Sequence, residues 1–358
     1  MADNKDKKVL KVPDLRFPEF TDEWERKKFR DVCNITTGNK NTQDKSNDGI
    51  YPFYVRSQIV ERINSWTFDG EAILTAGDGV GVGKVFHYST GKIGVHQRVY
   101  ILSDFKCDGK YLYSYFAGHF YNRVKRMSAK NSVDSVRMEM IADMPISLPS
   151  TEEQKKIGHL LALLDERIAT QTKIIERYKS LIRGIAQNVV RSNKPNVLLS
   201  ECLECSSSTL QESDVCENGT YPVYGANGIV GYLDDYSTED EAVHIIKDGS
   251  GVGTVSYAIG RCSATGTLNT LQAKDGYLLQ YLYYMLKVFN FEPYKTGMAI
   301  PHIYFKDYGK AKIFCPPYQE QLRYAKMLSA IDDILLAEQN ILTNLNLQKQ
   351  YLLRQMFI

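Results

Sequence analysis

The chain contains an internal repeat, and this repeat restricts the possible fold more than any other feature. Three segments recur at a constant distance of 170 positions: 77–83 with 247–253, 51–54 with 221–224, and 111–113 with 281–283. Further along, the distance falls to 167, where Asp165 matches Asp332, which indicates one deletion of three residues. The chain is therefore predicted to be two copies of one module, and their differences suit two similar tasks on different targets.

Composition excludes some classes of protein and leaves others open. The 358 residues include 43% hydrophobic residues, enough for two packed cores. The 44 basic and 42 acidic residues nearly balance, so a surface that binds nucleic acid would have to be a local basic patch. Seven cysteines without a regular framework are typical of a reducing compartment. With no long apolar run and no signal-peptide pattern, a cytoplasmic location is predicted.

The pattern changes twice from globular to helical. These changes predict four parts: a first globular domain at 1–150 that begins with a polar leader at 1–20, a long helix at 151–192, a second domain at 193–316, and a second long helix at 317–358. Short β-rich runs between Gly and Asp turns, followed by a helical pattern at 111–124, predict an α/β (α+β) fold for both domains. In the first copy the runs lie at 50–55, 72–74, 84–87 and 98–102. A capping box that follows Pro149, formed either by Ser150 and Glu153 or by Thr151 and Gln154, is expected to begin the first long helix.

Apolar residues recur at alternating steps of four and three in both long helices, which is typical of a coiled coil. The predicted seam consists of Ile157, Leu161, Leu164, Ile168, Gln171, Ile175, Tyr178, Ile182, Leu328, Ile331, Leu335, Glu338, Leu342 and Leu345. Gln171 and Glu338 occupy matching places, where they either control register or extend to water. One domain cannot cover such a stripe along its length, so the helices are predicted to pair with each other as an antiparallel coiled coil.

Several short motifs suggest enzymatic chemistry, but none is complete. The glycine-rich segment 77–83 lacks the spacing of a phosphate-binding loop and instead predicts a hairpin turn. The tetrad at 315–318 is similar to the one that holds the target amine in amino-methyltransferases, but Cys315 replaces its hydrogen-bonding first residue. Cys202 and Cys205 lack the second pair of ligands that zinc requires. The sequence therefore predicts no catalytic residue and no metal site.

Basic and polar side chains in turns remain as a candidate nucleic-acid surface. They are Lys40, Arg56, Lys84, Lys92, Arg98, Arg126, Lys130, Asn131, Lys247, Arg261, Lys274, Lys295, Lys306 and Lys310. Arginine can bind guanine edges with two hydrogen bonds, whereas lysine mostly meets phosphate. Each residue taken alone is also explained as ordinary solvated surface. The set differs between the copies, as two readers of different sequences would require.

Several segments together resemble the specificity subunits of type I restriction–modification systems. They are VPDLRFPEF at 12–20 with Trp24, the loop 79–85, MPISLP at 144–149, and the helix start EEQ at 152–154 leading to LLD at 163–165. The second copy has Glu320, Gln321, Ile331 and Asp332 in the same order. The resemblance covers essentially the whole chain. The chain departs from the family pattern in the short connection at 191–196.

The resemblance implies a non-catalytic subunit that recognises double-stranded DNA. Each globular copy would be a target recognition domain for one half of a split, asymmetric sequence, and the long helices would set the gap. Two modification (methyltransferase) subunits and restriction (translocase/nuclease) subunits would dock on it. S-adenosylmethionine, ATP and Mg would bind those partners, and no cofactor is expected on this chain. A scaffold that does not bind DNA and a self-sufficient modification enzyme remain as alternatives.

Overall fold

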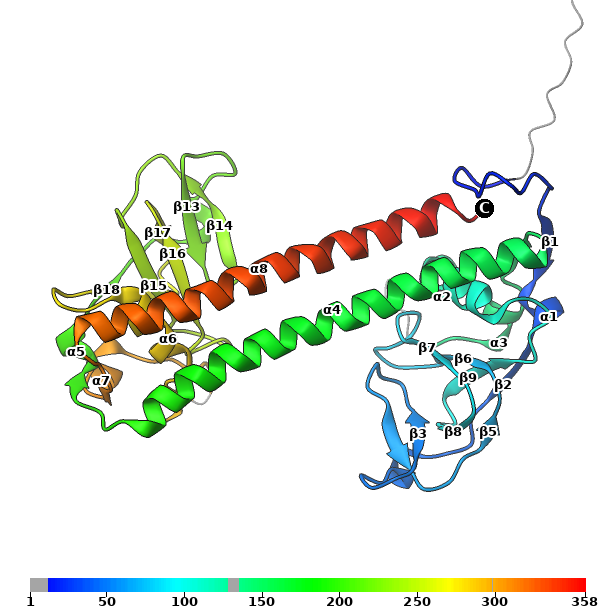
Figure 1. The fold of residues 1–358 in the computed structure, drawn as a ribbon, viewed down its shortest axis with the longest axis horizontal. Helices are drawn as coiled ribbons and strands as arrows, with labels where there is room; N and C mark the ends of the chain where they lie inside the picture. The colour runs from blue at the N-terminus through cyan, green and yellow to red at the C-terminus, as the bar shows by residue number, and fades with distance from the viewer. Residues whose placement is uncertain (1–11, 128–134, 298) are drawn as a thin grey trace, which may run out of the picture. The chain divides into compact units, whose positions relative to one another are not determined.

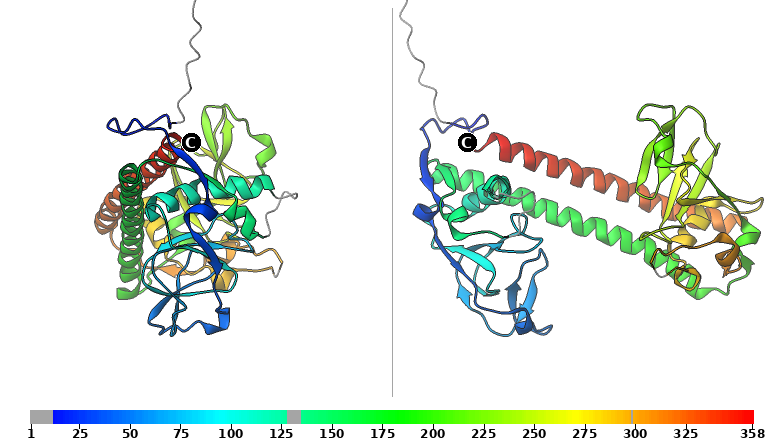
Figure 2. Two further views of the ribbon diagram at one scale, coloured as in Figure 1. Left: turned by 90° about the vertical axis from the view of Figure 1, so that its right-hand side faces the viewer. Right: turned by 180° about the vertical axis from the view of Figure 1, so that it is seen from behind.

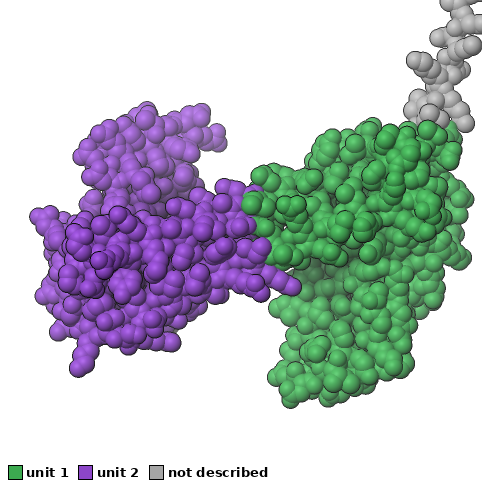
Figure 3. All heavy atoms as spheres, viewed as in Figure 1, with its two compact units in different colours: residues 1–171, 341–358 green, residues 172–340 purple. Residues whose placement is uncertain are grey.

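The computed structural model describes residues 12–127, 135–297 and 299–358, and the chain divides into two compact units (Figure 3). Unit 1 comprises residues 1–171 and 341–358, and unit 2 comprises residues 172–340. Each unit holds one globular domain together with part of both long helices, α4 (Thr151–Ser192) and α8 (Tyr318–Gln355). The predicted α/β fold with two repeated domains is confirmed.

The domain of unit 1 is built on two four-stranded sheets (Figure 1). The antiparallel sheet has the order β2 (Asn34–Thr37), β9 (Val99–Ser103), β6 (Ala72–Ala76) and β7 (Phe86–Ser89). The other has the order β4 (Glu61–Ile63), β3 (Tyr51–Tyr54), β8 (Lys92–Val95) and β5 (Phe68–Asp69), with β3 and β8 parallel. Smaller elements complete it: β1 (Glu25–Lys28) paired with β10 (Pro145–Leu148), α1 (Phe29–Val32), η1 (Thr42–Asp44) and α3 (Met138–Ala142).

Helix α2 (Gly109–Met127) supplies the centre of this unit's core. It contains the predicted helix Tyr111–Val124, and in Figures 1 and 2 it lies between α4 and the antiparallel sheet. Its apolar face packs against residues from both neighbours, including Leu102 of β9 and Leu161 of α4. Phe116 and Phe120 stack at 4.4 Å between ring centroids. The heptad pattern of α4 therefore begins inside the domain core.

Unit 2 repeats this arrangement. Its antiparallel sheet has the order β12 (Leu203–Ser207), β18 (Leu268–Ala273), β15 (Glu241–Ile246) and β16 (Val255–Ile259). The other sheet contains β14 (Gly228–Leu233), β13 (Tyr221–Gly225) and β17 (Ser263–Ala264), again with a parallel pair. The remaining elements are β11 (Val197–Leu198) with β19 (Lys312–Ile313), α5 (Leu199–Cys202), α6 (Leu279–Lys287), α7 (Phe305–Tyr308), η2 (Glu212–Asp214) and η3 (Glu292–Tyr294).

Equivalent backbone hydrogen bonds align the two domains residue by residue. The amide of Gly77 donates to the carbonyl of Arg98 at 2.8 Å, and the amide of Lys247 donates to Thr267 at 3.0 Å. Arg98 thus matches Thr267, which is one residue short of the 170-residue offset. The expectation of one three-residue deletion is therefore wrong. Gaps occur earlier as well, because loops between paired strands can change length without disturbing the sheet.

In unit 1, the first turns of α4 lie beside the last turns of α8. Lys349 of α8 donates a hydrogen bond to Asp165 of α4. Near the end of α8, Met356 and Phe357 are buried in the core of the unit. The ring of Phe357 lies 5.2 Å from that of Tyr111.

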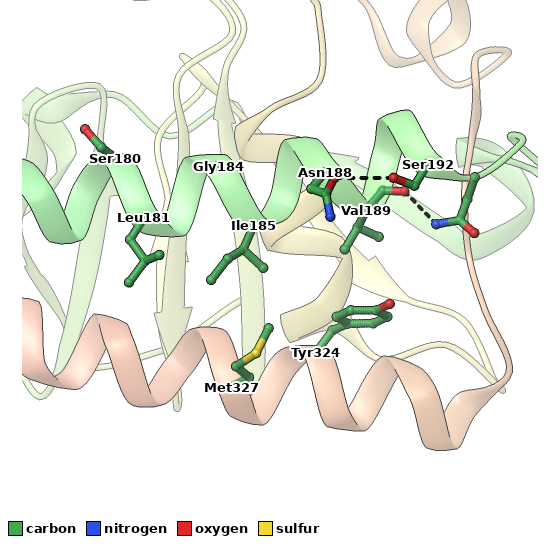
Figure 4. Close-up of a pocket in the computed structure, with 10 residues that line it drawn as sticks. Ser180, Leu181, Gly184, Ile185, Asn188, Val189, Ser192, Tyr324 and Met327 are labelled. Atoms are coloured by element: carbon green, nitrogen blue, oxygen red, sulfur yellow. Dashed lines mark hydrogen bonds between the residues drawn. The ribbon is translucent and has the colours of Figure 1, made fainter.

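In unit 2, the last turns of α4 lie beside the first turns of α8 (Figure 4). Ile185 of α4 and Tyr324 and Met327 of α8 line a groove of about 490 Å³. Within each unit the helices therefore run in opposite directions, as predicted for an antiparallel coiled coil. All the seam residues are buried or half-buried; Gln171 is buried and Glu338 is half-buried.

The capping box predicted from Ser150 and Glu153 at the start of α4 is only half formed. The Ser150 hydroxyl accepts the amide of Glu153 at 3.3 Å. The Glu153 side chain does not return to Ser150; it accepts two hydrogen bonds of 2.7 Å from Arg16 in the leader. Because Glu153 is fully buried, this ion pair fixes the leader to the start of α4.

Candidate nucleic-acid interface

In unit 1, two candidate arginines meet at one carboxylate of the glycine-rich loop 77–85. Nη1 of Arg56 lies 2.6 Å from Oδ1 of Asp78, and Nη1 of Arg98 donates to Oδ2 of the same residue. The side chains of Arg56 and Arg98 are 43% and 62% exposed, whereas that of Asp78 is 17% exposed. Asp78 therefore holds the guanidinium groups of Arg56 and Arg98 at the surface, where both are accessible to solvent.

Sheet pairing explains why these residues meet. Arg56 follows the end of β3, Arg98 precedes β9, and Asp78 follows the end of β6, which is paired with β9. The loop connects the antiparallel strands β6 and β7, as the predicted hairpin requires. At Gly81 a Cβ would lie 2.5 Å from the carbonyl oxygen of Arg56, so only glycine permits this close approach.

Neighbouring groups determine the charge states of Asp78 and His96. Burial raises the pKa of the Asp78 carboxyl, but the hydrogen bonds from Arg56 and Arg98 outweigh it and leave the pKa below its usual value. Burial, together with Arg56 and Arg98, lowers the pKa of the neighbouring His96. Nδ1 of His96 accepts the backbone amide of Arg98 at 3.1 Å, so a neutral imidazole holds the turn that carries this arginine.

Two candidate lysines belong to the same part of the domain. Lys84 lies in the glycine-rich loop, and its ammonium is 5.6 Å from the ring centroid of Tyr121. The carbonyl of Lys40 accepts the amide of Gln97 at 2.8 Å, which places Lys40 beside the turn that carries Arg98. Arg56, Arg98, Lys84 and Lys40 are thus four cations whose backbone lies in or beside the loop that carries Asp78. We call these five residues the arginine-clamp cluster.

The other candidates of the first domain lie elsewhere or outside the described residues. The ammonium of Lys92, on β8, lies 5.0 Å from the ring centroid of Trp66. Arg126, near the end of α2, donates to the carbonyl of Asn122 at 3.3 Å. Lys130 and Asn131 lie outside the described residues.

The candidates of the second domain do not form one cluster. Arg261 stacks on Tyr236 at 4.8 Å and pairs with Glu239 at 3.2 Å. Lys295 pairs with Glu292 at 2.6 Å, and Lys274 donates to the carbonyl of Ser200 at 2.9 Å. The last contact ties two backbone segments together, so it gives Lys274 a structural role.

The glycine-rich loop of unit 2 lies beside the segment 302–310, in which the sequence predicted only Lys306 and Lys310 as candidates. The backbone of Asp248 in this loop forms an isolated antiparallel β-bridge with that of His302. The amide of Ile303 donates to the carbonyl of Lys247 at 2.9 Å. The ammonium of Lys306 lies 5.1 Å from the ring centroid of Tyr304, which is 46% exposed. Lys310, at the end of this segment, is exposed. In unit 1, Asp78 and His96 were missed because they become relevant only through contacts between strands.

The remaining motifs have structural explanations. Burial raises the pKa of the Cys202 and Cys315 thiols to about 12, so both stay protonated and are poor metal ligands. Within the described ranges, no group of three or more His, Cys, Asp or Glu side chains could hold a metal ion. Among the helices that the structure describes, none combines the length and apolarity needed to cross a bilayer.

Comparison with known proteins decides the family. The model of the type I restriction modification DNA specificity domain matches residues 21–179 and again residues 199–347. The chain belongs to this family. The two matches are the two repeated domains with most of their long helices, so the family also confirms the duplication.

Several relatives carry the same description. The EcoDI specificity subunit of Escherichia coli is 28% identical over 173 residues, which cover 46% of this chain and 38% of that protein. The match thus spans well under half of that relative. A putative type I specificity subunit of Mycoplasma genitalium is 22% identical over 72% of this chain and 73% of its own length.

Solved structures show the same fold over nearly the whole chain. The crystal structure of an S subunit from M. genitalium matches with a TM-score of 0.72 at 17% identity, covering 97% of this chain and 99% of that one. A chain from a study of complex assembly and conformational transition in the type I R-M system matches with a TM-score of 0.51 at 15% identity, covering 95% and 98%.

Proposed function

We propose that this chain is the DNA-recognition subunit of a type I restriction–modification complex. Each domain reads one half of a split, asymmetric sequence in double-stranded DNA, and the chain itself catalyses no reaction. The observation that supports this most is that one scaffold occurs twice with different residues around the same glycine-rich loop. A protein that reads two different half-sites needs this combination of shared fold and divergent surface.

The positive charge of the arginine-clamp cluster supports contact with DNA, although the net charge of the whole chain is only +2. The arginine-clamp cluster gathers four cations at one end of the first domain, and phosphate contacts of this kind supply most of the affinity for DNA. Arginine also binds guanine edges specifically. A scaffold that binds only protein would not need such a cluster.

The long helices offer surface for the partner subunits. In unit 2, Leu181 of α4 and Met327 of α8 are 47% and 43% exposed beside the groove between the helices (Figure 4). We propose that two modification subunits dock along α4 and α8, and that restriction subunits join that assembly. S-adenosylmethionine, ATP and Mg would be bound by these partners, and the complex would act in the cytoplasm.

Selection from randomised duplexes tests the DNA-recognition role. The full-length chain, with and without a type I modification subunit, should enrich a bipartite sequence whose half-site centres lie about 10 base pairs apart. Binding should weaken steeply with salt, since phosphate contacts release counterions. Recovery of no sequence, together with salt-independent binding, would favour the scaffold alternative.

A domain exchange tests the assignment of half-sites to domains. Replacing residues 25–150 by the corresponding domain of another family member should change one half of the selected sequence and leave the other half unchanged. The unchanged half is an internal control for folding and for DNA binding by the second domain. Loss or change of both halves would contradict the modular assignment.

A further inference from the structure

We propose that Arg56 and Arg98, held by Asp78, are the residues through which the first domain recognises guanine in its half-site. This inference rests on the proposed function and deepens it. Asp78 acts as a positioning residue, and the second domain reads its half-site without an equivalent pair of arginines.

The geometry suits base recognition. The two oxygens of the Asp78 carboxylate each accept one Nη1 hydrogen bond, so both planar guanidinium groups are held close together. Each arginine meets Asp78 through Nη1, so Nε and Nη2 form the other edge of each guanidinium fork, the edge that can meet a base. Successive bases on one strand are about 3.4 Å apart, so neighbouring base pairs can meet two adjacent arginine forks.

The second domain provides a comparison at matched positions. The amide of His96 donates to the carbonyl of Tyr54 at 3.0 Å, and the amide of Thr265 donates to that of Tyr224 at 2.8 Å, so Arg56 matches Ala226. The bonds from Gly77 and Lys247 match Arg98 with Thr267. Neither Arg56 nor Arg98 therefore has a basic counterpart at the matched position of the second domain.

The two lysines of the cluster are also specific to the first domain. The amide of Gly266 donates to the carbonyl of Leu210 at 2.8 Å, just as the amide of Gln97 donates to that of Lys40. Lys40 thus matches Leu210, and Lys84 matches Thr254 in the repeated loop. Only the anion is retained, because Asp78 matches Asp248. The same end of the scaffold therefore presents four cations in one domain and none at the matched positions in the other.

A different cation is present in both domains. The amide of Thr67 donates to the carbonyl of Ile93 at 2.9 Å, and the amide of Ser237 donates to that of Cys262 at 3.2 Å. These bonds match Lys92 with Arg261. Each cation stacks on an aromatic ring, at 5.0 Å on Trp66 and at 4.8 Å on Tyr236. A pair retained in two readers of different sequences carries no information that distinguishes their half-sites.

The test measures the affinity of the full-length chain for its selected duplex, for duplexes altered in one half-site, and for random duplexes. We expect Arg98→Ala and Arg56→Ala to weaken binding to the selected duplex roughly 5- to 150-fold, the range for losing one bidentate base contact. Binding to random duplexes should change little. Preference should be lost at guanine positions of the first half-site only, while selection of the second half-site shows that the variant is folded.

Two conservative variants separate base contact from phosphate contact. Arg98→Lys keeps the charge but loses the planar fork, so it should be as defective as Arg98→Ala. Asp78→Asn should reduce preference in the first half-site without weakening binding to random DNA, because it removes a negative charge. The matched controls, Asp248→Asn and Lys92→Ala, should leave the preference of the first half-site unchanged.

Two results would overturn the inference. One is an Arg98→Lys chain that binds every duplex as the wild type does. The other is equal loss on selected and random duplexes with a weaker salt dependence, which would identify both arginines as phosphate contacts. The proposed function fails by a different result, in which the wild-type chain selects no sequence at all.

Discussion

Replacing His244 by leucine should stabilise unit 2 and remove a pH dependence. His244 lies in β15 and is 1% exposed, and within the described part of the chain neither ring nitrogen has a hydrogen-bond partner. The matched residue of the first domain is Leu74, which is fully buried in β6. Burying an unpaired polar group costs about 1–3 kcal/mol, so His244→Leu should gain about that amount at pH 7.

The pH dependence follows from the same burial. Burial lowers the pKa of His244 to about 4, against 6.5 for an ordinary histidine. As the pH falls below 6.5 the unfolded chain takes up a proton that the folded chain refuses, so stability is complete above 6.5 and is lost between 6.5 and 4. At about 1.4 kcal/mol per pKa unit, the loss approaches roughly 3 kcal/mol near pH 4.

Urea or thermal unfolding of the full-length chain between pH 4 and pH 8 measures both effects. The difference between His244→Leu and the wild type should widen as the pH falls through this window. The reciprocal variant, Leu74→His, should lose stability and acquire the same kind of pH dependence in unit 1. If His244→Leu unfolds like the wild type at every pH, the imidazole is not buried without partners and the reasoning is wrong.

Two further predictions concern the leader and the helices. Glu153→Ala should cost about 3 kcal/mol of unfolding free energy because it leaves Arg16 without its buried partner, whereas Glu152→Ala, which breaks an exposed pair with Lys155, should cost at most about 1 kcal/mol. Equal losses in urea unfolding would contradict this. Inserting seven residues into both α4 and α8 adds about 10.5 Å of helix, so the selected spacer should lengthen by about three base pairs while both half-sites stay the same. Altered half-sites with an unchanged spacer would contradict the role of the helices as a ruler.

Local patterns in the sequence were sufficient for much of the architecture. The heptad spacing of Ile157, Leu161 and Leu164 predicted a long helix because helical periodicity is a local property, and α4 begins at Thr151 as the proline before it suggested. A strand expected at Lys84–His87 is β7 at Phe86–Ser89 instead. Gly83 adopts a φ of +66° there, so the loop continues two residues further than the β-rich composition indicated.

The candidate surface could be predicted only in part. Residue type and turn position indicated Arg56 and Arg98, but they also indicated Lys274, which binds a backbone carbonyl. Nothing local distinguishes these three residues. Asp78 was not predicted as a site residue because its role depends on hydrogen bonds from two arginines that lie 22 and 20 positions away in the sequence.

The sequence by itself determined the duplication, the two long helices and the family resemblance, because repeats and heptads are recognised from the order and spacing of residue types along the chain. The tertiary structure decided which cations act together and which match between the copies. Lys92 and Arg261 are equivalent only through the pairing of strands, since loop gaps break the constant offset. Hydrogen bonds between strands that are distant in sequence fix the register of their pairing, and this register cannot be derived from the order of residues alone.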